Sequence, residues 1–123
     1  MPIEGIQAAI VRVSDVDAAI RFPTEALGLE LGSDWPYGDG QRWVTVGPPG
    51  GAGAAIALEP AADEASVGGF AGVVLGAADP QATAAELARR GVEFPQPVTR
   101  QAWGASMGLL ADPDGNVLVL HEA

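Results

Sequence analysis

The chain of 123 residues is long enough for one domain with a single hydrophobic core and too short for two ordinary domains. Hydrophobic residues make up 48% and charged residues 18%, which is typical of folded proteins, and 17 glycines with 10 prolines predict many tight turns. The net charge of −10, with six arginines and no lysine, argues against a nucleic-acid groove and against binding to an anionic membrane. The absence of cysteine excludes disulfides, thiolate catalysis and cysteine-ligated metals.

The N-terminal residues Met1–Gly5 contain no basic stretch and no long apolar run. We therefore expect neither a signal peptide nor a membrane span, and a cytoplasmic protein.

The first half of the chain predicts one β-α-β-β-β unit. Ile6–Val13 is rich in β-branched residues and predicts a strand, after which Ser14 or Asp15 caps a helix. The apolar positions of this helix follow helical spacing, and we expect it to stop near Pro23, because proline lacks the N–H that continues a helix. Three further strands are predicted at Leu29–Leu31, Arg42–Val46 and Ala54–Leu58.

The second half repeats this order. Phe70–Leu75 predicts a strand, Asp79 caps a helix that ends at Gly91, and Val92–Phe94 begins another strand. The last stretch, Leu109–His121, predicts a hairpin, because proline presets a turn and glycine supplies a positive φ in its Asp-Pro-Asp-Gly centre. We interpret the chain as an α+β fold of two tandem modules, residues 5–59 and 70–122, joined by a linker at 60–69. A generic α+β sandwich is the alternative.

Several segments resemble a known superfamily. They are Val13–Ile20 followed by Phe22 and Leu27–Leu29, the strand Arg42–Val46, and Trp103-Gly104 ahead of Asp112–Asn116. Together they are similar to the vicinal oxygen chelate superfamily, which includes glyoxalase I, bleomycin-resistance proteins and extradiol dioxygenases. The resemblance covers nearly the whole chain and implies two βαβββ modules that form a curved mixed sheet, a cup around a small-molecule site. One departure is Pro23, where the family usually carries tyrosine.

The resemblance also places the four metal-ligand positions of the family on this chain. They fall on Ala8, Ala57, Gly72 and Val119, and none of these side chains can bind a metal. A shift of one residue would place Gln7 at the first position instead of Ala8, but neighbouring residues of a strand face opposite sides, so only one of the two can face the site. Glu59 and His121 share the faces of Ala57 and Val119, but each lies two residues, roughly 6–7 Å, further along its strand. We therefore expect no bound metal and no other cofactor.

Five residues are the candidates for ligand binding, and each has two interpretations. His121 is the only side chain of a type that exchanges protons near neutral pH, and it is either a solvent-facing strand end or a hydrogen-bonding group of the site. Arg12 resembles the residue with which glyoxalase I holds the carboxylate of its thiol cofactor, or else it pairs with an acidic side chain. Trp35, Trp43 and Trp103 either line a site for a flat apolar ligand or anchor loops. Phe22, Phe70 and Phe94 are expected in the core.

Three functions remain open. The first is a metal-free binding protein that sequesters a small hydrophobic or aromatic compound, as bleomycin-resistance proteins do. The second is an enzyme of glyoxalase or dioxygenase type, a lyase, isomerase or oxidoreductase, with His121, Glu59 and Arg12 as candidate participants. The third is a structural or regulatory dimer. The resemblance implies a homodimer, because relatives commonly enclose their sites in one.

Overall fold

The computed structural model describes residues 2–123, and the chain divides into two compact units, Met1–Ser66 and Val67–Ala123. The boundary falls inside the segment expected as a linker. Unit 1 contains β1 (Ala8–Val13), α1 (Val16–Arg21), β2 (Glu30–Pro36), β3 (Arg42–Gly47) and β4 (Ala55–Pro60). Unit 2 contains β5 (Gly69–Ala77), α2 (Pro80–Arg89), β6 (Glu93–Arg100), β7 (Ser106–Ala111) and β8 (Asn116–Glu122). None of the helices in residues 2–123 is long and apolar enough to cross a membrane.

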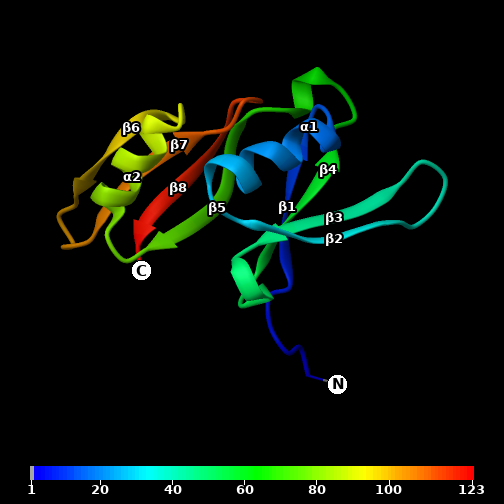
Figure 1. The fold of residues 1–123 in the computed structure, drawn as a ribbon, viewed down its shortest axis with the longest axis horizontal. Coiled ribbons are helices and arrows are strands. Elements are labelled where there is room, and N and C mark those ends of the chain that lie inside the picture. Colours follow the sequence, from blue (N-terminus) through cyan, green and yellow to red (C-terminus); the bar gives the residue numbers. More distant parts are fainter. Residues whose placement is uncertain (1) are drawn as a thin grey trace. The chain divides into compact units, whose positions relative to one another are not determined.

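Each unit is one four-stranded mixed sheet with one helix (Figure 1). The strand order is β1-β4-β3-β2 in unit 1 and β5-β8-β7-β6 in unit 2, with the first two strands parallel and the others antiparallel in both. The two units therefore share one topology, element by element. This confirms the α+β fold of two tandem βαβββ modules.

Both helices begin at the aspartates that the sequence indicates. Asp15 accepts a hydrogen bond from the Ala18 amide at 3.2 Å, and Asp79 accepts one from the Ala82 amide at 3.1 Å. The helix α1 ends at Arg21, near Pro23 as expected, but the chain continues as a π-helical turn over Phe22–Ala26. Proline is tolerated there because it lies in the first turn of that segment, where its missing N–H donor is not needed.

Each unit has its own core between its helix and one face of its sheet. In unit 1 the core side chains include Val11, Val13, Val44, Val46 and Leu58. In unit 2 they include Leu110, Leu118 and Leu120 together with Leu87 of α2. Because side chains alternate across a strand, the residues between these positions form the opposite face of each sheet, which we call the open face.

The C-terminal hairpin forms as predicted around Asp112–Gly115. Asp112 accepts hydrogen bonds from the Asp114 and Asn116 amides at 2.9 and 2.8 Å, and Gly115 has φ of 81°. Asn116 is 4% exposed and accepts a hydrogen bond from the Gly68 amide at 3.0 Å. The turn therefore also fixes the chain that enters β5.

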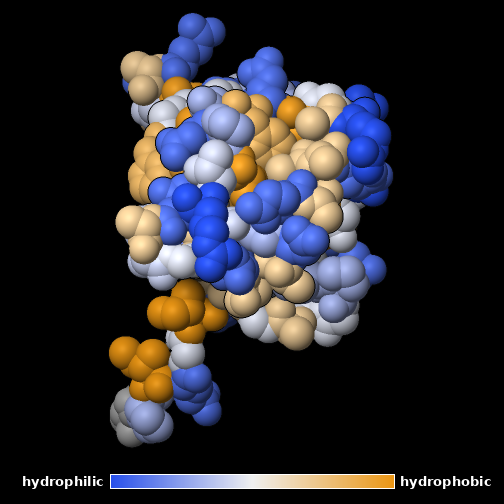
Figure 2. Space-filling model, turned by 90° about the vertical axis from the view of Figure 1, so that its left-hand side faces the viewer, coloured by the Kyte–Doolittle hydropathy of each residue, from blue (hydrophilic) through white to orange (hydrophobic). Residues whose placement is uncertain are grey.

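Two local predictions are corrected by the structure. The first strand begins at Ala8 instead of Ile6: Ile3 and Ile6 are 92% and 78% exposed, and Figure 2 shows hydrophobic groups along the segment that leads to the N-terminus. Phe70 is 69% exposed and is not a core residue, because its register with Val117 places it on the open face of unit 2.

Candidate functional site

Four polar and aromatic side chains form a row across the open face of unit 1. Arg12 of β1 is the register partner of Glu59 of β4, and Trp35 of β2 is the partner of Trp43 of β3. Thr45 pairs with Ala57, and Trp43 and Glu59 lie two residues further in the same direction along their antiparallel strands. The order across the sheet is therefore Arg12, Glu59, Trp43, Trp35, and we call these four residues the charged–aromatic row. Pairing joins β3 to β4 at Thr45 and Val46, so Trp43 and Glu59 lie just beyond the last register pair of these two strands.

The aromatic half of the row is a cross-strand tryptophan pair. Trp35 is 54% exposed and Trp43 is half-buried, so the indoles leave apolar ring surface accessible. Opposite residues of antiparallel strands have Cβ atoms about 4.5–5.5 Å apart, which keeps the two rings adjacent. Beside them the face continues with small or apolar side chains, those of Ala57 and Ile10. This arrangement suits a flat apolar ligand that stacks on indole.

The charged half of the row is an ion pair between Arg12 and Glu59. The Arg12 side chain is 51% exposed and that of Glu59 is 20% exposed. The expected pairing of Arg12 with an acidic side chain is therefore confirmed, and the pair lies on the open face. Its role in ligand binding stays a prediction. A cavity of about 400 Å³ opens beside the pair, where the ends of β1 and β4 meet the turn between β2 and β3, and Tyr37 and Gln41 contribute to its lining.

Arg42 holds the hairpin that carries the two tryptophans. Its guanidinium donates to Asp34 at 2.7 and 2.9 Å within the hairpin, and it forms an ion pair with Asp17 of α1 at 2.9 Å. The hydrogen bonds that Arg42 donates hold the pKa of Asp34 below its ordinary value, and donating to both Asp34 and Asp17 raises the pKa of Arg42. This network lies on the helix side of the sheet and fixes β2 and β3 behind the tryptophan pair.

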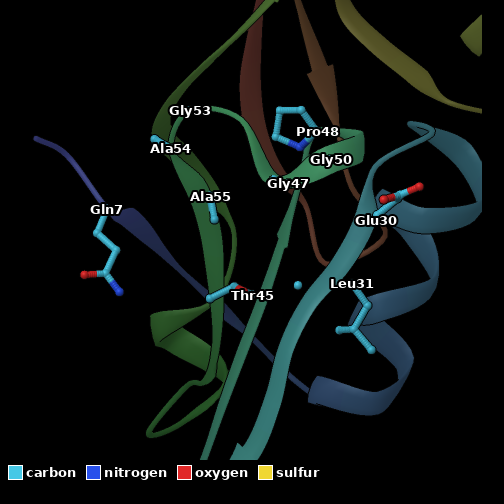
Figure 3. A pocket seen from close by; sticks show the side chains of 12 residues that line it. Gln7, Glu30, Leu31, Thr45, Gly47, Pro48, Gly50, Gly53, Ala54 and Ala55 are labelled. Atoms are coloured by element: carbon cyan, nitrogen blue, oxygen red, sulfur yellow. The ribbon is translucent and has the colours of Figure 1, made fainter.

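A second cavity, of about 330 Å³, lies at the other end of the same sheet. Figure 3 shows Thr45 and Ala55 on adjacent strands, with Gln7 to one side, Glu30 to the other and the glycine-rich loop from Gly47 above them. Thr45 is 7% exposed, and its hydroxyl accepts a hydrogen bond from the Ser33 amide at 3.0 Å. The lining contains no aromatic side chain, so a flat ligand finds no ring to stack on in this cavity, whereas the charged–aromatic row provides two indoles.

The other two predicted ligand residues belong to unit 2. Trp103 is 65% exposed in the turn between β6 and β7. His121 is half-buried on the open face, where it pairs in register with Gly76 and Met107. In the shared topology it occupies the strand position that Glu59 occupies in unit 1.

The geometry also indicates which nitrogen of the neutral His121 ring carries the hydrogen. Nδ1 lies 2.7 Å from the carbonyl oxygen of Glu122. Because a carbonyl oxygen only accepts hydrogen bonds, Nδ1 carries the proton, and Nε2 of the neutral ring keeps a lone pair. The ring can therefore accept a proton or a hydrogen bond at Nε2.

The residues at the metal positions of the family do not fit a metal. Ala8 and Ala57 lie on the open face of unit 1, and Val119 lies on that of unit 2, but their side chains carry no donor atom, and Gly72 has no side chain. Within residues 2–123, no group of three or more histidine, aspartate or glutamate side chains is arranged to hold an ion.

Sequence reasoning named the members of the row separately but did not bring them together. Gln41 and Arg42 were not singled out at all, although one lines the larger cavity and the other fixes the hairpin. The available signal was the hairpin itself, because a turn between the two strands brings Trp35 opposite Trp43. In that register Asp34 and Arg42 lie diagonally across the hairpin, within reach of an ion pair.

The topology defines a class of protein, the proteins built from two βαβββ modules. Residues 5–120 match the family model described as Glyoxalase/Bleomycin resistance protein/Dioxygenase superfamily. The chain belongs to this superfamily, as its sequence motifs indicated.

Individual relatives match over almost their whole length. The uncharacterized protein YetH of Bacillus subtilis is 30% identical over 120 residues, which are 98% of this chain and 99% of the relative. A crystal structure of a superfamily member from Sphaerobacter thermophilus has 34% identity and a TM-score of 0.90, with 98% of each chain covered. TnmS3, an antibiotic binding protein from a Streptomyces species, has 32% identity and a TM-score of 0.82, with 99% of this chain and 98% of that chain covered.

Proposed function

We propose that this protein binds and sequesters a small hydrophobic or aromatic compound without a metal. The observation that carries the proposal is the exposed Trp35–Trp43 pair on a sheet face whose metal-ligand positions hold Ala8 and Ala57. Stacking on an aromatic face is the largest favourable contribution such a face can make to binding. The similarity to TnmS3, over nearly the full length of both chains, supports an antibiotic-like ligand.

The test is a fluorescence titration of the intact protein with a panel of planar polycyclic natural products and drugs. Binding at the tryptophan pair should quench the intrinsic fluorescence saturably and raise the melting temperature. Expression of the protein should also protect bacteria from the compound that binds most tightly, since sequestration lowers its free concentration. A panel that produces neither quenching nor a thermal shift would contradict the proposal.

A catalytic function is the second candidate, and His121 is the observation that favours it. Its Nε2 can act as a base on the open face of unit 2, while Glu59 and Arg12 are the candidate participants in unit 1. The reaction would be that of a lyase, isomerase or oxidoreductase of the glyoxalase or dioxygenase type. Turnover of a hemithioacetal or a catechol that is lost in His121→Gln, or stoichiometric metal that is required for turnover, would support this function over sequestration.

The quaternary structure and location belong to the same proposal. We expect a homodimer, because the open faces expose Ile10, Phe70 and Val74 at 49%, 69% and 62%, and association would cover apolar surface of this kind. Sedimentation at micromolar concentration tests this prediction, and a monomer would contradict it. The cytoplasmic location stays a prediction that cell fractionation can test.

A further inference from the structure

We propose that Glu59 determines which charges the ligand can carry: by neutralising Arg12 it makes the site accept uncharged and cationic aromatic compounds and reject anionic ones. This inference rests on the proposed binding function and assigns a ligand class to the same site. It concerns a carboxylate that sequence reasoning considered only as a displaced metal ligand or a catalytic group.

The sheet itself brings the two charges together. Arg12 and Glu59 are register partners on adjacent parallel strands, so their side chains leave the sheet side by side on the same face. The ion pair therefore requires no closure of a loop to bring its two residues together. A ligand carboxylate that binds Arg12 must displace Glu59, which is already its ion-pair partner.

The exposures of the two side chains favour the internal partner. Glu59 is 20% exposed and Arg12 is 51% exposed. The carboxylate is thus the more enclosed member of the pair, and displacing it would leave a poorly hydrated negative charge beside the incoming anion. Such a charge is costly when it loses its partner.

The second guanidinium at the same cavity is also occupied. Arg42 is bound to Asp34 and Asp17, so the two arginines that line the cavity face three carboxylates. The whole chain adds a net charge of −10, which repels anions at low ionic strength and attracts cations. The three carboxylates at this end of the sheet therefore act against an anionic ligand, since they already neutralise both arginines.

The experiment measures three versions of one ring system: anthracene carrying a hydroxymethyl, an aminomethyl or a carboxylate group. Wild-type protein should bind the hydroxymethyl and aminomethyl compounds at least 10-fold more tightly than the carboxylate. In Glu59→Gln, Arg12 keeps a hydrogen-bond acceptor but loses its counter-charge. The carboxylate compound should then gain about 10-fold in affinity, while the hydroxymethyl compound changes less than about 2-fold.

Glu25→Gln is the matched control. Glu25 forms an exposed pair with Arg21 at 3.9 Å in the helical segment of the same unit, so the variant removes the same charge away from the open face. It should leave the ratio of carboxylate to hydroxymethyl affinity unchanged. The double variant Arg12→Gln/Glu59→Gln should lose the gain for the carboxylate, because the gain acts through Arg12.

The outcomes separate the two proposals. Binding of the hydroxymethyl compound with an unchanged affinity ratio in Glu59→Gln, or an equal change in Glu25→Gln, overturns the role of Glu59 and leaves the binding function standing. Absence of saturable quenching by all three compounds overturns the binding function and the inference together. Equal melting temperatures of wild type and Glu59→Gln verify that the variant is folded.

Discussion

Replacing Trp35 by alanine tests the aromatic half of the charged–aromatic row. Trp35 lies opposite Trp43, and its side chain is the more exposed of the pair. The variant removes one of two adjacent ring surfaces and leaves the ion pair at the other end of the row intact. We expect weaker binding of an aromatic ligand and a fold that is retained.

The magnitude follows from the exposed area. A tryptophan side chain has about 250 Å² of surface, so the 54% exposure of Trp35 leaves about 130 Å² for a ligand to cover. At about 25 cal/mol per Å², full coverage is worth about 3 kcal/mol, and coverage of one ring face about half of that. The dissociation constant should therefore rise by a factor of about 10 to 150. Loss of the cross-strand pair should lower the free energy of unfolding by about 1 kcal/mol.

Isothermal calorimetry with the tightest compound of the panel measures the effect, and urea denaturation measures stability in parallel. Trp35→Phe is the matched control, because it keeps an aromatic face at the same position and should retain most of the affinity. If Trp35→Ala binds within about 2-fold of wild type while the ligand still quenches fluorescence, the ligand does not stack on this pair. The placement of the site on the open face of unit 1 would then be refuted.

The remaining predictions concern other parts of the chain. Trp103→Ala should leave the melting temperature unchanged, because its ring is exposed in a turn of unit 2; a lowered melting temperature would show that the ring packs against the fold. Asn116→Ala should lower the free energy of unfolding in urea by about 1–3 kcal/mol, because it leaves the Gly68 amide without its acceptor; a loss under 0.5 kcal/mol would contradict this. Hydrogen bonds from Arg42 lower the pKa of Asp34 in the folded protein. The Asp34 carboxylate therefore stabilises the fold above its unfolded pKa of about 3.9, and this contribution is lost as the pH falls through the lower pKa of the folded state. Carboxyl NMR titration should show that lowered pKa returning upward in Arg42→Ala.

The sequence by itself determined the order of elements and the topology class. Proline, glycine and aspartate restrict the backbone locally, so the caps at Asp15 and Asp79 and the turn at Asp112–Gly115 could be predicted from a few neighbouring residues. The repetition of cap, helix, glycine and strand revealed the duplication for the same reason. Where a local rule was weak the boundaries moved, as at Pro23, where the helical path continues as a π-helical turn.

Only the tertiary structure decided which side chains meet. The row of Arg12, Glu59, Trp43 and Trp35 depends on the register of strands that are far apart in sequence, and a shift of one residue would send each side chain to the other face. The exposure of Phe70 likewise depends on the irregular pairing of β5 with β8. Composition and periodicity specify which residues are apolar and how they alternate. Register is set by long-range pairing and by packing against the helix, and it is this pairing that places a carboxylate beside Arg12.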